Sequence, residues 1–452
     1  MKEHYLPYPF SLGYATSLLK QVFQETSGFD ACALDLTDKK FVEYVLNYRP
    51  DILLVDVPTI SFPLVMGLLK EIKLNIDLKI VLTGGHVTAL ARDVMGRYPF
   101  IDYLILGEYP LVFKSLVTSN ENNCHDIKGL VYRQDGKIII NPAEPQKFNL
   151  DELPYPDRAD FPIELYHDFD IAGRPCVNML TSLGCPYNCS FCMPIHVIYC
   201  SSHMYRMREP SEIVNEMVYV KEKYGAKQVY FDDDTFAVNR ERLKKLCNEL
   251  ISRNLDLPWT AMGDATLDYE TLNQLSKAGC VGIKFGVETV STSTLKKINK
   301  TFLDTDKISN FVKQSSKLGI WTHATYIIGL PGDRKEDLEK TINFSKNLHT
   351  DSVQFSIATP YPGTPFYGEA KNNDWLATDD WTMYDGANYS VVNYPWLKKE
   401  EIESLHKKAL KEWYKKALIQ EITNPKRAIK IVKAKGTRYA IRKIKSHLKG
   451  EL

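Results

Sequence analysis

The sequence predicts an α/β protein. We expect an N-terminal doubly wound, Rossmann-like (flavodoxin-like) domain, then a partial (βα)6 barrel of the TIM type and a helical C-terminal region. Two observations predict this arrangement. Short runs of β-branched and aromatic residues, too apolar for surface strands, alternate with amphipathic helical patterns. Several helical patterns also end at a glycine, which forms a left-handed helix C-cap at the lowest cost.

The first 140 residues contain four apolar runs that we expect to form buried strands separated by helices. They occupy residues 31–36, 51–57, 79–83 and 102–106. A glycine pair, Gly84-Gly85, follows the third of these strands, and a single glycine, Gly107, follows the fourth. Glycine pairs are common after parallel strands, so these loops are compatible with any doubly wound fold.

Six further apolar runs predict the strands of the barrel. They occupy residues 177–182, 228–232, 259–262, 281–287, 320–328 and 352–358. Helical patterns lie between them, and Gly225, Gly279 and Gly319 mark the ends of three of these helices. Six successive βα units predict a parallel sheet with right-handed crossovers.

These patterns divide the chain into five expected segments. They are an N-terminal α/β domain at 1–140 that lacks its first strand, a linker at 141–174, the barrel at 175–365, a closing region at 366–422, and a basic tail at 423–452.

Composition indicates an ordinary globular protein of a reducing cytoplasm. The chain is 44% hydrophobic and 25% charged, and its net charge of +1 gives no sign of a nucleic-acid partner. The longest apolar stretch, at 51–70, is interrupted by Asp56, Pro58 and Pro63 and is a poor membrane span. The first residues lack the apolar core of a targeting segment.

The tail at 423–452 is strongly basic, with ten Lys or Arg against the single acid Glu451. Apolar residues are interleaved at near-helical spacing, which is typical of a helix that lies on an anionic membrane surface. A solvated helix with one face docked on the protein has the same pattern. The tail therefore allows a peripheral location at the inner membrane surface.

The most informative motif is a run of three cysteines, Cys185, Cys189 and Cys192. Three thiolates on one loop can hold three irons of a cubane cluster and leave the fourth iron without a protein ligand, open for chemistry. With nine cysteines in the chain, the expected number of chance C-x3-C-x2-C runs is on the order of 0.004. The spacing therefore indicates a metal site.

Two other interpretations of this loop remain. Cys189, Cys192, His196 and Cys200 could close a tetrahedral zinc shell. A disulfide knot is disfavoured because the number of cysteines is odd and no signal peptide is present. The loop follows the first barrel strand, at the carboxyl end where active sites of such sheets lie, and this position favours a reactive cluster over structural zinc.

Other barrel strands also end in residues suited to a site. Asp232, Asp233 and Asp234 follow the second strand, although helix capping could use one or two of them. Glu288 follows the fourth strand, and a Gly-Leu-Pro-Gly run that begins at Gly329 follows the fifth. Glycine there permits close approach of the backbone to a ligand.

The cysteine loop and these strand ends resemble the radical SAM superfamily over roughly residues 175–381. The resemblance includes Phe191, the aromatic residue just before the third cysteine. It implies a [4Fe-4S] cluster on Cys185, Cys189 and Cys192 whose free iron chelates S-adenosylmethionine (SAM). One electron then cleaves the sulfonium and leaves methionine and a 5′-deoxyadenosyl radical.

The same resemblance implies roles for the other strand-end residues. Asp233 or Asp234 would meet the methionyl amino group, and Glu288 would approach the ribose or the methionine. Gly329 and the segment around Ala358 would line the adenine. Leu183 departs from the family, because many relatives carry arginine at its place in the cluster loop.

The strand-end motifs further resemble the branch that carries an N-terminal cobalamin-binding domain, which includes class B methyltransferases and anaerobic magnesium-protoporphyrin ester cyclases. In this comparison, the residues around the cobalamin nucleotide tail and corrin edge would be Thr59, Ser61, Gly84, Gly85 and Glu108. His86 could be a nucleotide contact, although a lone loop histidine is more often on the surface.

Two departures limit the cobalamin prediction. The chain has no Asp-x-His-x-x-Gly run, so no histidine is offered as a lower axial ligand. Relatives usually begin with a buried strand, whereas here a Pro-rich stretch follows Met1 almost directly. In a flavodoxin-like order that missing strand would be central. The domain closes differently, or the true start lies upstream, or cobalamin binding has been lost.

The resemblance leads us to expect methylation of an unactivated carbon in a biosynthetic pathway. The second enzymatic hypothesis is oxidative cyclisation or rearrangement by the same radical, without methyl transfer. A non-enzymatic hypothesis is that the chain is a cobalamin- or metal-binding regulatory module. The expected partners are a small-molecule or lipid-like substrate and a low-potential electron donor of the flavodoxin or ferredoxin type, with no nucleic acid.

Overall fold

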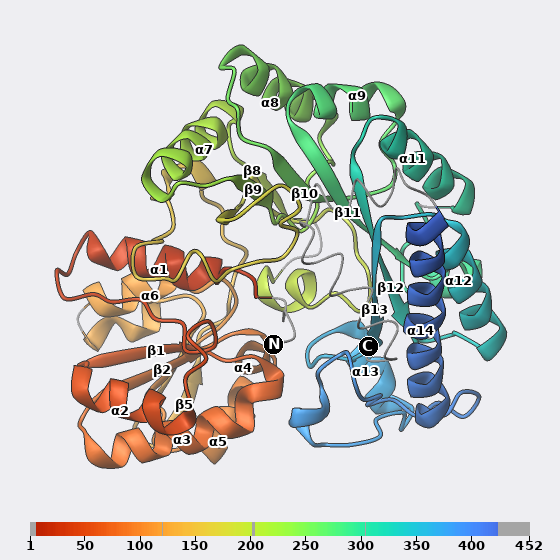
Figure 1. Cartoon of the computed structure of the whole chain (residues 1–452). Helices are drawn as coiled ribbons and strands as arrows, with labels where there is room; N and C mark the ends of the chain where they lie inside the picture. The colour runs from red at the N-terminus through yellow and green to blue at the C-terminus, as the bar shows by residue number, and fades with distance from the viewer. Residues whose placement is uncertain (1–5, 120, 201–203, 303, 424–452) are drawn as a thin grey trace.

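The structure is a computed structural model that describes residues 6–119, 121–200, 204–302 and 304–423 (Figure 1). It contains two main sheets, each covered by helices, so the predicted α/β class is confirmed. The basic tail at 424–452 lies outside the described residues, and the expectation attached to it stays a prediction.

The first sheet has five strands in sequential order. They are β1 (Ile52–Asp56), β2 (Lys79–Thr83), β3 (Tyr103–Ile105), β4 (Leu130–Gln134) and β5 (Lys137–Ile140). β1 to β3 are parallel, as predicted, whereas β4 and β5 form an antiparallel hairpin that the sequence analysis did not predict. Its turn residues, Asp135 and Gly136, have φ of 49° and 73°, and Asp-Gly between apolar runs is a strong hairpin signal.

Helices cover both faces of this sheet. α1 (Phe10–Lys20) and α6 (Pro110–Thr118) pack on one face, and α2 (Asp38–Tyr48), α3 (Phe62–Asn75) and α5 (Ala91–Arg97) pack on the other. A short helix, α4 (Gly85–Ala89), begins directly after β2. The strand order does not reverse, in contrast to the predicted flavodoxin-like order.

The predicted strand at 31–36 is wrong. The segment forms a turn in which Asp30 Oδ1 accepts hydrogen bonds from the backbone N–H groups of Cys32 and Ala33, each at 3.0 Å. This local bonding offers the backbone an alternative to a strand. Within the described residues no strand pairs with the outer edge of β1, which therefore forms one edge of the sheet.

The second sheet has six parallel strands, and each matches a predicted strand within about three residues. They are β6 (Cys176–Met179), β9 (Gln228–Phe231), β10 (Trp259–Gly263), β11 (Cys280–Glu288), β12 (Trp321–Ile328) and β13 (Ser352–Ile357). Two short strands, β7 (Ser182–Gly184) and β8 (Tyr205–Met207), form a separate antiparallel pair after β6. The predicted run of parallel βα units is confirmed.

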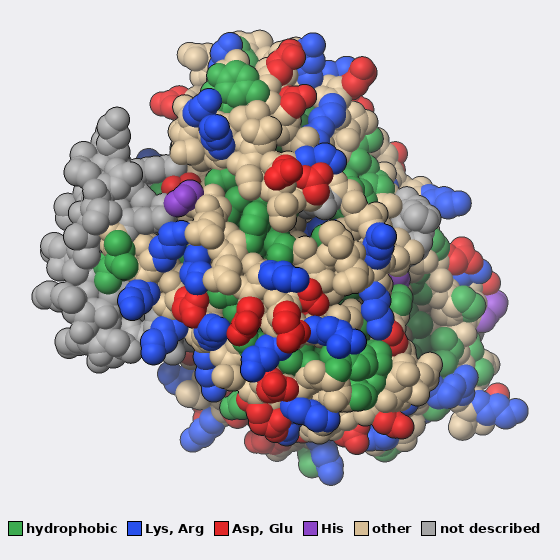
Figure 2. Space-filling view, turned by 90° about the vertical axis from the view of Figure 1, so that its right-hand side faces the viewer, with side chains coloured by type: hydrophobic (Ala, Val, Ile, Leu, Met, Phe, Trp, Pro, Cys, Tyr) green, Lys and Arg blue, Asp and Glu red, His purple; other side chains and the backbone are tan. Residues whose placement is uncertain are grey.

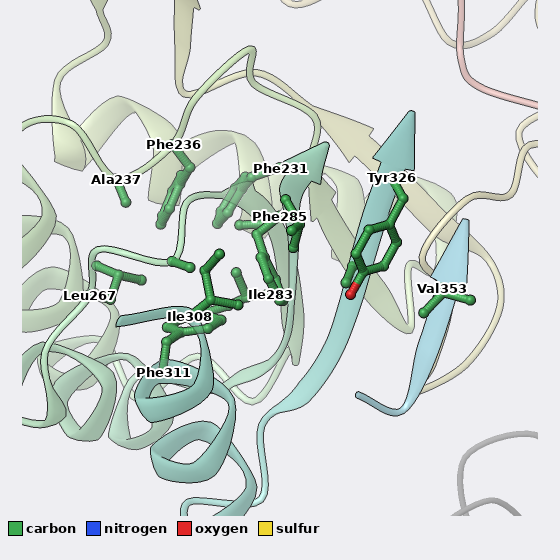
Figure 3. Close-up of a cluster of buried hydrophobic side chains, with 14 of the residues drawn as sticks. Phe231, Phe236, Ala237, Leu267, Ile283, Phe285, Ile308, Phe311, Tyr326 and Val353 are labelled. Atoms are coloured by element: carbon green, nitrogen blue, oxygen red, sulfur yellow. The ribbon is translucent and has the colours of Figure 1, made fainter. Parts of the chain in front are cut away.

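Helices cover the outer face of this sheet (Figure 1). They are α7 (Pro210–Tyr224), α8 (Arg240–Ser252), α9 (Tyr269–Lys277), α10 (Thr292–Lys297), α11 (Thr305–Lys317) and α12 (Lys335–Asn347). Gly225, Gly279 and Gly319 adopt φ of 61°, 92° and 77° after α7, α9 and α11, as the sequence predicts. Phe231, Phe285 and Phe311 belong to the apolar core between sheet and helices (Figure 3).

The C-terminal region follows the last barrel strand. It comprises α13 (Pro365–Asn372), the 3-10 turn η5 (Trp381–Met383) and the long helix α14 (Lys399–Thr423). α14 packs on α12 and β13, and acidic and basic side chains are interspersed over this side of the molecule (Figure 2). Among the described helices, none has the length and apolar character needed to cross a membrane.

A buried ionic network joins the linker to the barrel. Glu216 on α7 accepts a 2.7 Å hydrogen bond from Arg158 and a second one from Arg208, and all three side chains are nearly inaccessible to solvent. Burial alone raises the pKa of Glu216, but the two guanidinium groups outweigh it and hold the pKa below its ordinary value. Arg208 also pairs with Asp151 in the linker turn η3 (Leu150–Glu152).

We expect Glu216→Ala to destabilise the fold by about 3–5 kcal/mol, because it leaves two buried guanidinium groups without their carboxylate. Chemical denaturation gives the free energy of unfolding. The matched control is Glu249→Ala, which removes the partner of Arg253 in a half-exposed pair on α8 and should cost less than about 1 kcal/mol. Equal losses in the two variants would contradict the structural role of the network.

Candidate active site

The cysteine loop follows β6 and the short strand β7, at the carboxyl end of the barrel sheet. Cys185 and Cys189 are buried and Cys192 is half-buried. The loop is tied to two distant segments, since Ser190 N–H donates to the carbonyl of Ile298 and the carbonyl of Ser190 accepts from Phe366 N–H, both at 3.1 Å. Its path is therefore fixed by the barrel.

Two carboxylates after β9 hold the start of this loop. Asp233 accepts hydrogen bonds from Thr181 N–H at 2.7 Å, Thr181 Oγ1 at 2.5 Å and Ser182 Oγ at 2.6 Å. Asp234 accepts from Gly184 N–H at 2.9 Å and from the Tyr199 hydroxyl at 2.5 Å. Both residues thus position the backbone that leads to Cys185.

The helix-capping explanation for this acidic run is wrong. The next helix, α8, begins at Arg240, and its cap is Asn239, whose side chain accepts from Arg242 N–H at 2.9 Å. Asp234 is exposed to solvent, yet desolvation by the surrounding protein raises the pKa of its carboxyl. These two facts together indicate that Asp234 faces a recess and not the outer surface.

Glu288 lies at the end of β11 in a strained conformation, with φ of 62°. Its Oε1 accepts a 2.5 Å hydrogen bond from Lys300 Nζ, which also donates to the carbonyl of Gly286 at 3.1 Å. A Cβ on Gly286 would lie 2.1 Å from Glu288 Oε1, so a side chain there would displace the Glu288 carboxylate. Strain of this kind costs about 1–3 kcal/mol and clusters at functional sites.

The Glu288–Lys300 pair lies beside the cysteine loop. Desolvation lowers the pKa of Lys300, but Glu288 and Cys189 outweigh this and raise it, so Lys300 stays charged. Burial raises the pKa of Cys189, and the Lys300 charge partly offsets that rise. The pair therefore places a fixed cation next to the position of a thiolate.

Burial raises the pKa of Cys185 to about 11 and that of Cys192 to about 12, and neighbouring Asp234 adds to both shifts. At neutral pH these thiols are protonated, so loading of a metal must displace their protons. Each thiol lies close enough to the others to shift their pKa values, which places the three around one region.

The zinc interpretation is not supported. His196 Nε2 lies 3.0 Å from the carbonyl oxygen of Cys189, and Cys200 Sγ lies 3.6 Å from the carbonyl oxygen of Val197. No three His, Cys, Asp or Glu side chains of the described residues converge as a single metal ion requires. A cubane cluster does not need that convergence, because each thiolate binds a different iron. All nine cysteines are free, which also excludes the disulfide knot.

The residues predicted to line adenine lie at the carboxyl ends of β12 and β13. Gly329 has φ of 91°, its carbonyl accepts from the Tyr394 hydroxyl at 2.9 Å, and a Cβ there would lie 2.9 Å from Ile402. Ala358 is buried, whereas Phe191 is half-buried against the barrel core. The closing region thus explains Gly329 without a ligand, and the adenine role stays a prediction.

The residues predicted to surround cobalamin lie at the carboxyl ends of β1, β2 and β3. Thr59 and Ser61 form the 3-10 turn η1 (Thr59–Ser61), and Gly84 and Gly85 precede and begin α4. α4 contacts the π-helical turn η4 (Pro194–Ile198) that follows Cys192. Glu108, after β3, pairs with Arg206 of β8 at 2.5 Å. The structure therefore brings the N-terminal loops next to the cysteine loop.

Packing within the chain accounts for both glycines. A Cβ on Gly84 would lie 2.7 Å from Asp56 Oδ1, and one on Gly85 would lie 2.3 Å from Met193 Sδ. The expectation that His86 is a surface residue is wrong, since it is buried between Phe62 and Trp381, with ring centroids 4.2 and 5.0 Å away. Desolvation lowers its pKa to about 4, so its ring is neutral.

A cavity adjoins this junction of the two domains and holds about 690 Å³ of empty space, its open side included. Apolar side chains of α1, α6, the linker and the cysteine loop line it, and Glu108, Tyr199 and Arg208 add polar groups. Leu183, the residue that departs from the family arginine, is part of this lining. An apolar side chain at that place therefore matches its surroundings.

The inner face of the barrel carries polar residues that the sequence analysis did not identify, apart from Asp232. Asn178 Nδ2 donates to Asp232 Oδ2 at 3.3 Å, and Lys284 Nζ donates to Asp168 at 3.1 Å. Desolvation, followed by repulsion from Asp168, raises the pKa of Asp232 to about 6, although Lys284, Asn178 and Tyr230 oppose the rise. Polar residues at alternate positions of β6 and β9 are the sequence signal that marks this face.

The comparisons with known proteins agree with this site. The model described as "Radical SAM superfamily" matches residues 179–345. An uncharacterized methyltransferase of Pyrococcus horikoshii is 31% identical over 425 residues, which are 92% of this chain and 90% of that protein. An anaerobic magnesium-protoporphyrin IX monomethyl ester cyclase of Rubrivivax gelatinosus is 28% identical over 355 residues, 75% of this chain and 62% of the cyclase.

Solved structures share the fold of both domains. TsrM from Kitasatospora setae, with cobalamin and a [4Fe-4S] cluster bound, has a TM-score of 0.67 at 19% identity and covers 90% of this chain and 83% of its own. The cobalamin-dependent SAM radical enzyme OxsB, with aqua-cobalamin and SAM bound, has a TM-score of 0.60 at 17% identity. The match covers 91% of this chain and 59% of the OxsB chain.

A parallel barrel sheet with three cysteines on the loop after its first strand can hold an iron–sulfur cluster that has one iron without a protein ligand. The chain belongs to the radical SAM superfamily, as the resemblance implied. It is thus a radical SAM enzyme, and the cofactors of that class are a [4Fe-4S] cluster and SAM.

The raised pKa of Asp232 predicts a gain in stability when its charge is removed. The folded protein holds the Asp232 proton more tightly than the unfolded chain, so stability falls as pH rises from about 4 to about 6. Asp232→Asn should therefore stabilise the protein by about 1–2 kcal/mol at pH 7.5 and change little at pH 4. Thermal unfolding of the two proteins at both pH values measures this, and a destabilised variant at pH 7.5 would contradict it.

Proposed function

We propose that this chain is a cobalamin-dependent radical SAM methyltransferase that places a methyl group on an unactivated carbon of a small molecule. The observation that carries the proposal is the 31% identity to the P. horikoshii methyltransferase along 92% of the chain, a share that includes most of the N-terminal domain. The similarity to cobalamin-dependent enzymes of the same two-domain fold supports it.

The cysteine loop would hold the cluster through Cys185, Cys189 and Cys192 and leave one iron free for SAM. Asp234 is better placed than Asp233 to meet the methionyl amino group, because it faces a recess while three hydrogen bonds already occupy Asp233. When bound, the cluster supplies the electron that cleaves the sulfonium of SAM.

Glu288 and Lys300 would act together beside SAM. Glu288 would accept hydrogen bonds from the ribose or the methionine, and Lys300 would hold the Glu288 carboxylate in place at 2.5 Å. The Lys300 cation would also stabilise the negative charge of the cluster near Cys189, because electrostatic interactions strengthen in a desolvated site. Gly329 and Ala358 would lie beside the adenine at the ends of β12 and β13.

Cobalamin would bind at the carboxyl ends of β1 to β3, where ligands of such sheets bind. Thr59, Ser61, Gly84, Gly85 and Glu108 all lie there; the helix that begins at Gly85 contacts the turn after Cys192, whereas the turn of Thr59 and Ser61 contacts η5. Binding would require Met193 to leave Gly85, which its thioether now covers. When bound, cobalamin supplies the methyl group, and this chain offers no lower axial histidine from an Asp-x-His-x-x-Gly run.

The reaction balances with two molecules of SAM and two electrons for each methyl group transferred. One SAM gives its methyl group and leaves S-adenosylhomocysteine. The other leaves methionine and, after it takes a hydrogen atom from the substrate carbon, 5′-deoxyadenosine. The electrons come from a low-potential donor of the flavodoxin or ferredoxin type.

Oxidative cyclisation is the second candidate, favoured by the 28% identity to the R. gelatinosus cyclase. The chain spans only 62% of that cyclase, whereas it spans 90% of the P. horikoshii methyltransferase. A cyclase would release 5′-deoxyadenosine without S-adenosylhomocysteine. The two products therefore separate the candidates.

We expect the protein, reconstituted anaerobically, to bind about four irons per chain and to convert SAM to S-adenosylhomocysteine and 5′-deoxyadenosine in equal amounts once substrate is present. Mass spectrometry of the two nucleosides gives the ratio, and the absorption spectrum reports bound cobalamin. Four irons with 5′-deoxyadenosine alone would retain the radical chemistry and remove methyl transfer.

Replacing any one of Cys185, Cys189 and Cys192 with alanine should reduce the iron content to below about one per chain and abolish reductive cleavage of SAM, because a cubane held by two thiolates is lost. Cys32→Ser and Cys200→Ser are matched controls, since these free cysteines lie outside the triad. Full iron content in the Cys185→Ala protein would contradict the assignment of the cluster ligands.

A further inference from the structure

The inner face of the barrel sheet is open to water along β12 and β13. On these strands every second side chain is buried in the outer core, while His323, Thr325, Ser352 and Ser356 are half-buried and Gln354 is exposed. Because alternate residues of a strand point to opposite faces, these five side chains share the inner face. The inner side of the barrel sheet, called the lumen below, is therefore polar and partly accessible to water along these two strands.

The lumen has an apolar floor below its polar wall. Phe169 and Ile171 pack with Tyr230 and Trp321, and a Cβ on Gly282 would lie within 3 Å of both Phe169 and Ile171. Above this floor the register places Asn178 beside Tyr230 and Lys284 beside His323. The polar groups thus form a band inside the barrel, between the floor and the cysteine loop. The members of this band are Asn178, Asp232, Asp168, Lys284, His323 and the hydroxyl of Tyr230.

Two acceptors stand side by side in this band. Asn178 Nδ2 donates to Asp232 Oδ2 at 3.3 Å, which fixes the orientation of the amide because its oxygen would repel the carboxylate. The Asn178 side chain is 2% exposed, and its Oδ1 has no hydrogen-bond partner among the described residues. A buried acceptor without a partner costs about 1–3 kcal/mol, and a donor that reached Asn178 Oδ1 after a local shift of its neighbours would remove that cost.

The charges of the band leave an excess of one negative charge. Lys284 and Asp168 neutralise each other through contacts of 3.1 and 3.2 Å. Desolvation, together with the Lys284 charge, lowers the pKa of His323 to about 3, so its ring is neutral. The Tyr230 hydroxyl donates hydrogen bonds to Asp168 and Asp232. Asp232 is then the uncompensated anion when it is ionised.

We propose that this band binds the ammonium group of a substrate amine between Asp232 and Asn178. The inference deepens the proposed function, on which it rests, by naming the substrate class. A primary ammonium fits the band because it supplies up to three donors and one positive charge. A neutral hydroxyl brings one donor and leaves the Asp232 charge unbalanced. The occupant is therefore a polar amine and not the apolar or lipid-like substrate that the basic tail suggested.

The test uses the full chain, reconstituted with cluster and cobalamin, and SAM that carries a trideuterated methyl group. The probe is a low-mass extract of the native host, divided by cation exchange into a retained amine fraction and a flow-through. We expect mass spectrometry to find the labelled methyl group in compounds of the retained fraction. Label only in compounds of the flow-through that lack an amine would overturn the amine assignment and leave methyl transfer intact. No label in either fraction would overturn the proposed function itself.

Variants of the full chain locate the amine within the lumen. With the retained fraction as substrate, Asp232→Asn should reduce labelling at least tenfold through a higher KM, and Asp232→Glu should recover part of it. The matched control is Gln354→Ala, on the same inner face but outside the band, which should stay within threefold of the native protein. Equal labelling by Asp232→Asn and the native protein would overturn the proposal.

Two measurements distinguish a loss of amine binding in the Asp232→Asn protein from a general structural defect. Iron content and the slow release of 5′-deoxyadenosine from SAM and dithionite without substrate should stay within twofold of the native protein, because neither needs the lumen amine. In addition, kcat/KM of the native protein should fall as pH drops through about 6, where Asp232 gains a proton, and this limb should be absent from Asp232→Asn. An unchanged acid limb in the variant would contradict the role of Asp232.

Discussion

The hydrogen bonds from two neighbouring aspartates to the start of the cysteine loop are the constraint on which the site depends. Asp233 binds Thr181 and Ser182, and Asp234 binds Gly184, so the end of β9 fixes the chain as it leaves β6. This tie adds to the hydrogen bonds of Ser190 with Ile298 and Phe366, which hold the middle of the cysteine loop. The loop therefore lies at the carboxyl end of the barrel sheet, close to Asp234.

The two faces of the barrel sheet have different roles. Its outer face buries large apolar side chains such as Phe231 and Phe285 against the helices and supplies the stability of the fold. Its inner face holds polar groups whose burial is unfavourable, including Asp232 and the strained Glu288. Buried charged groups can also serve structure, as Glu216 does, but strained and desolvated groups cluster where ligands bind, so the inner face is where substrate and SAM are expected to meet.

The sequence predicted the barrel well because its strands are buried against helices and read as continuous apolar runs. It failed at 31–36, where Asp30 caps a turn that competes with a strand, and it missed the hairpin of β4 and β5 despite Asp135-Gly136. The cysteine loop was found because its three ligands are local. The Glu288–Lys300 pair and the Asn178–Asp232 contact depend on a bulge and on strand register, which no local pattern encodes.

The central claim is that the iron left open by Cys185, Cys189 and Cys192 binds SAM directly. Electron–nuclear double resonance on the reduced, reconstituted protein tests it with SAM labelled at the amino nitrogen with ¹⁵N and at the carboxylate with ¹⁷O. We expect both nuclei to show hyperfine coupling to the cluster, and the coupling to disappear in the Cys185→Ala protein. A reduced cluster with four irons and no coupling to either nucleus would contradict the account.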